Sequence, residues 1–478
     1  MDKRPNIIFY FSDQQRWDTL GCYGQKLDVT PNLDKLAEMG TRFNGAFTCQ
    51  PVCGPARSCL QLGQYATATG CFTNAIAPDF TQKMLADYFN EAGYETAYVG
   101  KWHLASDNGT NMHYEKAAIP KERRGGYKDY WMASDVLEFT SHGYNGYVFD
   151  KNNEKVEFIG YRADCINNYA LDYIRNKESD NPFFLFVSQI EPHHQNDRNR
   201  YEGPDGSKER FKNYEKPGDL PEGKGDWEAQ YPDYLGCCHS LDYNIGRLVD
   251  TLKEKGIYDN TIIIYTSDHG SHFKTRNSEY KRSCHDGCIH IPLIIHGPGF
   301  EKGRVVEELV SLIDLPPTLL DCAGIAIPES YHGKSIRKLA QGDAKNWQEE
   351  VFLQISESHI GRAIRTQRYK YAVKAQGDPW KESGASTYYE AYFYDLQKDP
   401  HGTLAMSIIC PQSTSSALQP RLLLRQSRQR PAVWHGWSPS KRCMFCTAAV
   451  LRARDRALSK SGQILFVPAT MYTVLPMP

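Results

Sequence analysis

The chain has 478 residues, of which 40% are hydrophobic and 24% charged, and its formal net charge is −1. This composition is typical of a globular protein, and the length exceeds what a single hydrophobic core usually supports, so a large domain with a smaller companion is expected. The balanced charge gives no electrostatic support to a nucleic-acid partner or a membrane-surface partner.

The N-terminal segment leads directly into the short apolar stretch at residues 7–11. Five apolar residues are too few for the core of a signal peptide, and no later run approaches the roughly 18 apolar residues of a membrane-spanning helix. A cytoplasmic location is therefore expected. The fourteen cysteines are scattered along the chain and do not resemble a disulfide framework, so most of them are expected to be reduced thiols.

Short apolar strands alternate with helical stretches through the first three hundred residues. Strand patterns lie at residues 6–11, 94–99, 183–187, 261–265 and 291–295, and helical spacing lies at residues 31–38, 80–92, 162–174 and 234–255. This alternation predicts an α/β fold with a mainly parallel sheet sandwiched by helices. Active sites of such sheets lie at the carboxyl ends of the strands. The polar residues at those ends are Asp13, Lys101, His193 and Asp268.

The pattern changes at about residue 351 to short β segments, at residues 351–355, 362–365, 369–373 and 392–395. This predicts a smaller C-terminal antiparallel β subdomain over residues 351–400, after a large α/β domain over residues 1–350. Residues 105–160 and 195–230 are rich in Gly, Asn, Asp, Lys and aromatic residues and have little periodicity. They are interpreted as long insertions that shape a pocket.

Residues 401–478 differ in charge from the rest of the chain. They contain ten Lys and Arg residues and one acidic residue, Asp455, so their net charge is +9 while residues 1–400 carry −10. The composition favours a disordered or loosely attached basic tail. A sharper hypothesis is that the reading frame slips near His401 and the ending is translated out of frame, which resequencing of the gene tests. Another alternative is that the tail binds a membrane or nucleic acid.

The strongest local signal is the sequence Cys53-Gly54-Pro55-Ala56-Arg57, which precedes a helical stretch. By itself it is equally consistent with a helix N-terminus that carries a buried thiol, because proline favours the first helical turn. Five other elements occur along the chain, four of them just after predicted strands. They are Asp13-Gln14, Gly100-Lys101-Trp102-His103, Glu191-Pro192-His193-His194, Thr266-Ser267-Asp268-His269-Gly270 and Lys281.

Together these elements resemble the formylglycine-dependent sulfatase family of the alkaline-phosphatase-like superfamily, over residues 5–399. The resemblance implies a sulfuric ester hydrolase in which a maturation enzyme oxidises Cys53 to formylglycine. It implies a divalent metal ion, with Ca²⁺ favoured and Mg²⁺ or Mn²⁺ as alternatives. The metal ligands that it implies are Asp13, Gln14, Cys53, Asp268 and His269. The catalytic residues that it implies are Cys53, Arg57, Lys101, His103, His193 and Lys281.

The expected metal site departs from the family pattern at one position. Many members have two aspartates where this chain has Asp13-Gln14. A carboxamide oxygen also binds a hard cation, although with one negative charge fewer. The position of His269 varies between Asn and His in the family. Because histidine is a softer ligand than Ca²⁺ prefers, the identity of the metal stays open.

The resemblance also implies how charge is handled in the reaction. A sulfate ester is an anion, so attack on its sulfur atom requires positive charge around it. That charge is assigned to the metal ion, Lys101 and Lys281, and the attack is assigned to the hydrated aldehyde at residue 53. Arg57, in the helix beside this residue, would anchor the hydrate.

Proton transfer is assigned to the histidines. His193 is the expected general acid for the leaving oxygen, assisted by Lys281, and His194 is the alternative because the histidine is doubled. His103 would accept a proton in the second step, which expels sulfate and restores the aldehyde.

The natural substrate is the least determined part of the hypothesis. The aromatic segments at residues 127–131 and 144–147 suit stacking against sugar rings, which favours a sulfated carbohydrate. A phosphonate or phosphate ester hydrolase of the same superfamily is the rival among enzymes, and a catalytically silent binding protein on this scaffold is the rival outside them. Neither a nucleic acid nor a membrane is an expected partner, and the oligomeric state stays open.

Overall fold

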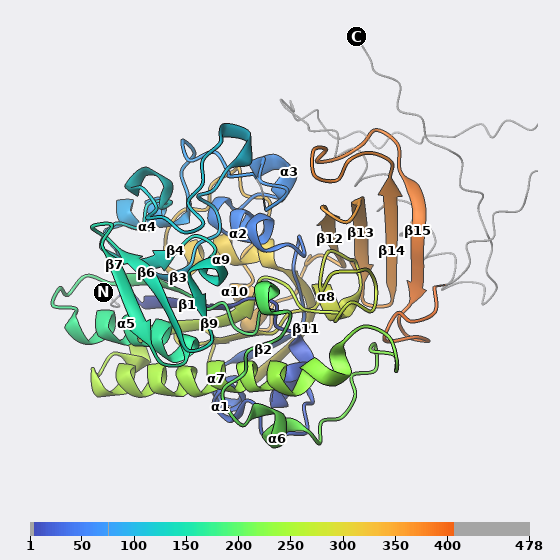
Figure 1. The fold of residues 1–478 in the computed structure, drawn as a ribbon. Coiled ribbons are helices and arrows are strands. Elements are labelled where there is room, and N and C mark those ends of the chain that lie inside the picture. Colours follow the sequence, from blue (N-terminus) through green and yellow to red (C-terminus); the bar gives the residue numbers. More distant parts are fainter. Residues whose placement is uncertain (1–3, 75, 406–478) are drawn as a thin grey trace, which may run out of the picture.

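A computed structural model describes residues 4–74 and 76–405 (Figure 1). The strands of its large sheet are β1 Asn6–Ser12, β2 Thr41–Phe47, β3 Glu95–Lys101, β4 Tyr130–Ser134, β5 Ser141–His142, β6 Asn145–Asp150, β7 Lys155–Ile159, β8 Phe183–Ser188, β9 Thr261–Ser267, β10 Leu293–His296 and β11 Arg304–Ser311. They are ordered β11-β2-β10-β9-β1-β8-β3-β4-β6-β5, and β7 pairs with β6.

The four neighbouring strands β9, β1, β8 and β3 form the centre of this sheet, and all their pairings are parallel. The pairing of β1 with β9 is in register from Asn6 with Thr261 to Ser12 with Ser267. Parallel neighbours require crossover connections, which helices supply here. The carboxyl ends of four adjacent strands therefore meet at one edge of the sheet.

Helices cover both faces of the sheet (Figure 1). They are α1 Pro31–Met39, α2 Cys53–Leu62, α3 Ala66–Thr69, α4 Leu85–Glu91, α5 Arg162–Asn176, α6 Ser207–Phe211, α7 Trp227–Glu254, α8 Asp286–Ile289, α9 Leu315–Cys322 and α10 Arg337–Ala340. In β1, Ile7, Phe9 and Phe11 belong to the core that contains α2, α4 and α9. Ile8 and Tyr10 belong to the core with α1, α5 and α7. Burial on both faces explains why residues 7–11 of β1 form a continuous apolar run.

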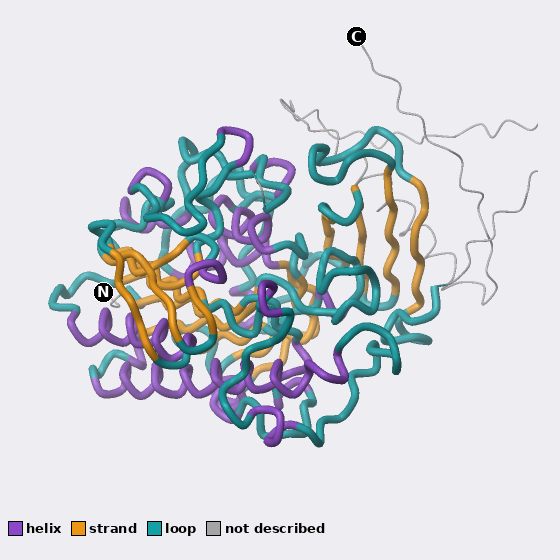
Figure 2. The backbone as a smooth tube through the Cα atoms, in the orientation of Figure 1, coloured by secondary structure: helices purple, strands orange, loops and turns teal. Residues whose placement is uncertain are grey.

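A second, smaller sheet lies beside the large one (Figure 2). Its strands are β12 Glu350–Ile355, β13 Ile360–Thr366, β14 Tyr369–Ala375 and β15 Tyr389–Asp395, in this order and antiparallel throughout. Val351, Leu353 and Ile355 pack in one apolar cluster with Phe47 of β2 and Cys288 of α8. The predicted fold class, a helix-covered, mainly parallel sheet with a small antiparallel C-terminal sheet, is confirmed.

Residues 105–160 are more regular than the predicted insertion. They contribute β4, β5, β6 and β7, which extend one end of the large sheet. The sequence pattern misses them because these strands lie near the sheet's edge, where alternate residues of β7 face solvent. Two further differences concern helices. The predicted helix at residues 80–92 begins only at Leu85, and the one at residues 234–255 begins earlier, at Trp227.

Part of the sequence-based hypotheses concerns residues that the structure does not describe. Residues 406–478 lie outside the described ranges, and with them most of the basic tail to which the hypotheses of disorder, a slipped reading frame and a membrane or nucleic-acid partner apply. Within residues 4–74 and 76–405, all cysteines are free thiols. No helix in these same ranges has the length and apolar character needed to cross a membrane.

A buried ion pair joins the small sheet to the large one. Lys370 of β14 is completely buried, and its Nζ lies 2.7 Å from Oδ1 of Asp286 in α8. Arg365 Nη2 lies 3.5 Å from the other oxygen of this carboxylate. Burial alone would raise the pKa of Asp286, but Lys370 and Arg365 hold that pKa well below its usual range. The charge pair thus fixes the small sheet against α8.

We expect the substitution Lys370→Met to lower the free energy of unfolding by about 3 kcal/mol, because it leaves a buried carboxylate without its nearest partner. The exposed pair of Lys381 with Asp378 provides the matched control. Lys381→Met should change the free energy of unfolding by less than about 0.5 kcal/mol. Urea unfolding measures both values. Equal values for the two variants would contradict the role given to Lys370.

Candidate active site

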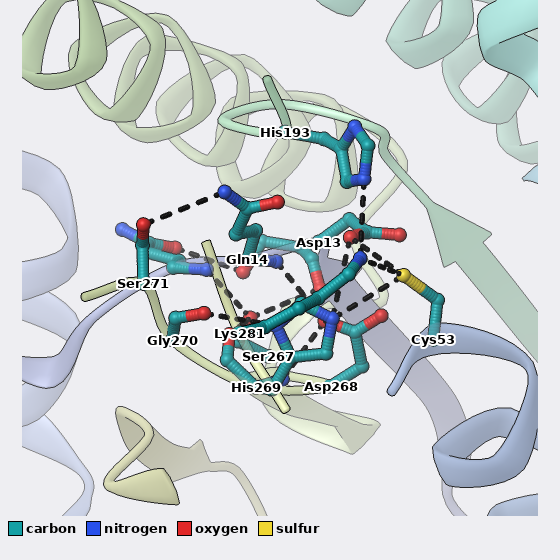
Figure 3. A network of polar contacts seen from close by, with 12 residues as sticks. Asp13, Gln14, Cys53, His193, Ser267, Asp268, His269, Gly270, Ser271 and Lys281 are labelled. Atoms are coloured by element: carbon teal, nitrogen blue, oxygen red, sulfur yellow. Dashed lines mark hydrogen bonds and ion pairs between the residues drawn. The ribbon is translucent and has the colours of Figure 1, made fainter. Parts of the chain in front are cut away.

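The polar residues at the strand ends lie together in the structure (Figure 3). Asp13 directly follows β1, Lys101 ends β3, and Asp268 directly follows β9. His193 lies in the loop after β8. Cys53, the first residue of α2, faces this group from the side of the helices. The parallel centre of the sheet therefore brings residues that are far apart in sequence to one point.

Cys53 lies in the middle of this group and is 1% exposed. Its Sγ lies 2.6 Å from Lys281 Nζ, 3.2 Å from His269 Nε2 and 3.4 Å from Asp13 Oδ1. Burial alone would raise the pKa of the thiol, but the charges of Lys101, Lys281 and His269 hold it well below the usual value, with a further contribution from a hydrogen bond with His103. The surroundings of residue 53 stabilise negative charge on its side chain.

Asp13 is a completely buried carboxylate with two cationic partners. Lys101 Nζ lies 2.7 Å and Arg57 Nη2 3.0 Å from its Oδ2. Burial and the neighbouring Cys53 oppose ionisation, yet Lys101, His193 and Arg57 keep the pKa of Asp13 well below its usual range. Arg57 thus reaches from the helix that begins at Cys53 to the carboxylate after β1. The anchoring of the residue 53 hydrate by Arg57 stays a prediction.

Asp268 is a second buried carboxylate, and its negative charge is less well compensated by neighbouring cations than that of Asp13. Its Oδ1 accepts hydrogen bonds from the backbone N–H of Gln14 at 3.0 Å and of His269 at 2.8 Å. Its Oδ2 is buried and accepts no hydrogen bond from any described residue, and Arg57 Nη2 lies 3.7 Å from it as an ion-pair partner. Burial and the charge of Asp13 raise the pKa of Asp268 to about 7. A buried carboxylate oxygen that accepts no hydrogen bond and lies beside a second carboxylate fits a site for a cation.

Gln14 and His269 complete the oxygen and nitrogen donors of this site. Gln14 Nε2 donates to Tyr201 Oη at 2.8 Å, and the carboxamide oxygen points away from Ser271 (Figure 3). His269 Nδ1 lies 2.9 Å from the carbonyl oxygen of Gly270, to which it can donate, and Nε2 lies 3.2 Å from Cys53 Sγ, so Nε2 is the nitrogen that would bind a cation when the ring is neutral. Candidate ligand atoms lie within 4.8 Å of one another in Asp13, Cys53, Asp268 and His269. This donor set fits one divalent cation.

The two adjacent histidines have different surroundings. His193 Nε2 lies 3.2 Å from Lys281 Nζ, and the side chain lines a pocket. The ring of His194 instead stacks on Tyr280, with the ring centroids 4.2 Å apart, and meets Tyr201 edge-on. Burial lowers the pKa of His194 to about 4. The geometry therefore favours His193 over His194 as the histidine that acts on a substrate.

A pocket with a volume of about 270 Å³ opens over Cys53. Its aromatic lining consists of Phe139, Tyr280 and Trp380. The aromatic segments that the sequence suggested for sugar stacking lie elsewhere. Within residues 127–131, Tyr127 and Trp131 are only 3% and 1% exposed and pack in the core, and residues 144–147 are not among the described residues that line this pocket. The interpretation is therefore wrong for Tyr127 and Trp131, whereas for residues 144–147, where Tyr144 is 43% exposed, it stays a prediction.

A chain of contacts from the small sheet supports both sides of Cys53. Glu357, in the turn between β12 and β13, has Oε2 2.6 Å from Arg282 Nε, beside Lys281. Its Oε1 accepts a hydrogen bond from the backbone N–H of Asn74 at 2.7 Å. Asn74 Oδ1 accepts one from the backbone N–H of Gly54 at 2.9 Å. One carboxylate thus fixes the loop of Lys281 and the start of α2.

Sequence reasoning missed several residues of this pocket. Glu138 lies in a short 3-10 helix, and Arg282 and Trp380 lie in turns and loops of the pocket lining. Glu357 supports this lining through its contact with Arg282, and none of the four residues belongs to a recognisable motif. Their positions depend on contacts between segments that are distant in sequence. No local pattern in the chain identifies them.

Two buried carboxylates, two lysines and a buried cysteine lie together where the central parallel strands end, which is where a hydrolase with the alkaline-phosphatase-like fold is expected to have its active site. Comparison with known families agrees. The sulfatase family model matches residues 5–325, and the model of the C-terminal region of N-sulphoglucosamine sulphohydrolase matches residues 278–423. The chain belongs to the sulfatase family and is a sulfuric ester hydrolase.

Individual relatives resemble the chain over most of its length. It is 31% identical to an ulvan-active sulfatase of Formosa agariphila, over 83% of this chain and 76% of the relative. It is 26% identical to an N-acetylglucosamine-6-O-sulfatase of Bacteroides thetaiotaomicron, over 83% of this chain and 82% of that one. The crystal structure of a putative sulfatase from Bacteroides fragilis superposes with a TM-score of 0.73 at 25% identity, covering 84% and 91% of the two chains.

The two carboxylates give an expectation for metal binding that does not depend on activity. Asp268→Asn should lose the bound divalent cation, because a neutral side chain replaces a ligand of the site. Metal content after dialysis against Ca²⁺ or Mn²⁺ measures this, as does the rise in melting temperature that a ligand of the folded state causes. Asp242→Asn removes a buried carboxylate that instead binds the backbone N–H of Leu33, and it should retain the cation. Unchanged metal content in Asp268→Asn would contradict the assignment.

Proposed function

We propose that the protein hydrolyses sulfate esters of carbohydrates through a formylglycine derived from Cys53 and a divalent metal ion. The position of Cys53 carries this proposal. Its side chain lies at the base of the pocket, in contact with Lys281 and with the carboxylate of Asp13. Ca²⁺ is favoured by the oxygen donors, and the nitrogen of His269 leaves Mg²⁺ or Mn²⁺ as alternatives. A maturation enzyme is the implied protein partner.

When bound, the cation would supply positive charge at the sulfate oxygens, and the hydrated aldehyde at residue 53 would supply the attacking hydroxyl. The described residues prepare the surroundings of this chemistry. Lys101 and Lys281 are buried and provide two fixed positive charges beside residue 53. Arg57 keeps Asp13 ionised and holds its position. His103, which lines the same pocket as residue 53 and helps to lower the pKa of its thiol, is the base for the second step.

The proton that the leaving alcohol oxygen needs is assigned to His193. As the S–O bond breaks, the leaving oxygen takes the bonding electron pair and receives a proton from Nε2 of His193. Lys281, 3.2 Å from this nitrogen, lies between residue 53 and the histidine and stabilises the charge that develops on the sulfate oxygens. Proton donation of this kind contributes about 10²- to 10⁴-fold to a rate.

A carbohydrate substrate is supported by the relatives and by the mouth of the pocket. The ulvan-active and N-acetylglucosamine-6-O-sulfatases are named for carbohydrate substrates. Two large apolar side chains line the pocket while remaining accessible, Phe139 with 51% and Trp380 with 44% exposure. Aromatic faces of this kind bind the apolar faces of sugar rings. Trp380 belongs to the C-terminal region, residues 351–400, that we propose as a separate subdomain.

The proposed function is tested with protein matured by a formylglycine-generating system and with Cys53→Ala made in parallel. Mass spectrometry identifies the modification at residue 53. Matured protein should hydrolyse sulfated mono- or disaccharides, and Cys53→Ala should lose at least about 1,000-fold in kcat/KM, because the nucleophile is removed.

Three outcomes contradict this proposal. Unmodified protein that cleaves sulfate esters at the full rate would exclude the formylglycine mechanism. A clear preference for phosphonate or phosphate esters would favour the rival hydrolase. Matured protein that carries formylglycine but cleaves none of these esters would indicate a silent binding protein.

We expect Trp380→Ala to raise KM for sulfated sugars about tenfold with little change in kcat, because it removes roughly 1–1.5 kcal/mol of stacking that substrate and transition state share. Steady-state kinetics on a sulfated monosaccharide measures both constants. Tyr243→Ala removes an aromatic residue of α7 that is 55% exposed and outside the pocket lining, and both constants should stay unchanged. An unaltered KM in Trp380→Ala would exclude a sugar platform at this residue.

A further inference from the structure

We propose that Glu138 is a positioning residue for His193, holding its imidazole in the orientation that donates a proton to the leaving oxygen. The inference rests on the proposed function, because it gives His193 the role of general acid. Glu138 lies in the short 3-10 helix Leu137–Thr140, which follows β4. It comes from a different part of the chain than the loop of His193, and neither a motif nor a strand end indicates it.

The carboxylate of Glu138 is itself held in place by the loop that carries His193. Its Oε1 accepts a hydrogen bond from the backbone N–H of Asn196 at 2.8 Å, and its Oε2 accepts one from Asn196 Nδ2 at 3.2 Å. Gln195 Nε2 donates to the backbone carbonyl of Glu138 at 3.3 Å. The side chain is only 6% exposed. The loop is therefore folded around a fixed, buried carboxylate.

His193 lies between this carboxylate and an ammonium group. Its Nε2 lies 3.2 Å from Lys281 Nζ, and its Nδ1 lies 3.8 Å from Glu138 Oε2. This Nδ1 is buried and has no hydrogen-bond partner among the described residues, so the carboxylate is the acceptor available to it. The present separation exceeds a hydrogen bond, and catalytic hydrogen bonds commonly shorten only when the substrate is bound.

A carboxylate at Nδ1 has a defined consequence for proton transfer. It keeps a proton on Nδ1, so that the second proton of the charged ring is on Nε2 and faces the pocket. When the S–O bond breaks, the electron pair goes to the leaving oxygen and the Nε2 proton follows. The neutral ring that remains still carries Nδ1–H towards Glu138, and it regains a proton at Nε2 from water before the next turnover.

The need for this proton depends on the leaving group, which provides the test. A sugar alkoxide is strongly basic and requires protonation as it leaves, whereas 4-nitrophenolate leaves without it. Glu138→Gln keeps the size of the side chain and removes its charge. We expect this variant to lower kcat for a sulfated monosaccharide by about 10- to 100-fold, which is part of the rate enhancement that general acid catalysis supplies. The kcat for 4-nitrophenyl sulfate should stay within about threefold of the wild-type value.

Further variants separate positioning from a purely structural role. Glu138→Asp retains the charge and should recover part of the lost kcat. In a His193→Ala background, Glu138→Gln should add no further loss, since a residue that acts through the histidine has nothing left to position. Glu202→Gln is the matched control, because Glu202 is a mostly buried carboxylate that binds Gly143, Arg198 and Arg200. The kcat of Glu202→Gln on both substrates should stay within about twofold of the wild-type value.

Several results would overturn the proposal. An equal loss of kcat on both substrates would mean that Glu138 only stabilises the fold. A change in KM alone would make it a substrate-binding residue. Unchanged kcat on the sugar sulfate, or a full additional loss in the His193→Ala background, would remove its link to His193. The wild-type protein tests the proposed function separately. If it hydrolyses phosphonate esters instead, the sulfatase assignment fails, and the same leaving-group comparison is made with alkyl and aryl phosphonates.

Discussion

A carboxylate that is removed from water loses several kcal/mol of solvation free energy, and Asp13 is completely buried. Its compensation comes from Lys101 at the end of β3 and from Arg57 in α2, which both contact the same oxygen. The ionised carboxylate is therefore stable only when both elements pack against β1. The two ion pairs of Asp13 therefore join β1, β3 and α2 and at the same time prepare the site around Cys53.

The central strands and the residues that follow them could be predicted from sequence. Strands such as β1 and β9 are buried on both faces and contain continuous apolar runs, which predict that Asp13 and Asp268 lie at strand ends. That these two ends are neighbours depends on the strand order, which periodicity does not contain. The resemblance to the sulfatase family implies that these two strand ends are neighbours, and the roles of the assembled residues remain proposals.

The residues around the pocket mouth could not be predicted, for a physical reason. Whether an aromatic side chain lies in the core or at a pocket is decided by segments distant in sequence. Tyr127 and Trp131 fill the core beside Tyr98, whereas Trp380, from an unremarkable loop, remains accessible. The same holds for Glu138, which is near His193 only because a helical turn and a loop from separate regions pack together.

The contacts of Glu357 have a consequence for the order of events during protein synthesis. The ribosome produces the strand ends and the Cys53 motif long before the turn between β12 and β13. Until that turn is translated and docks, neither Arg282 nor Asn74 has the carboxylate that fixes it. A nascent chain can therefore form its central sheet while its reaction centre is still incomplete, so that hydrolytic competence is a late event that depends on the C-terminal strands.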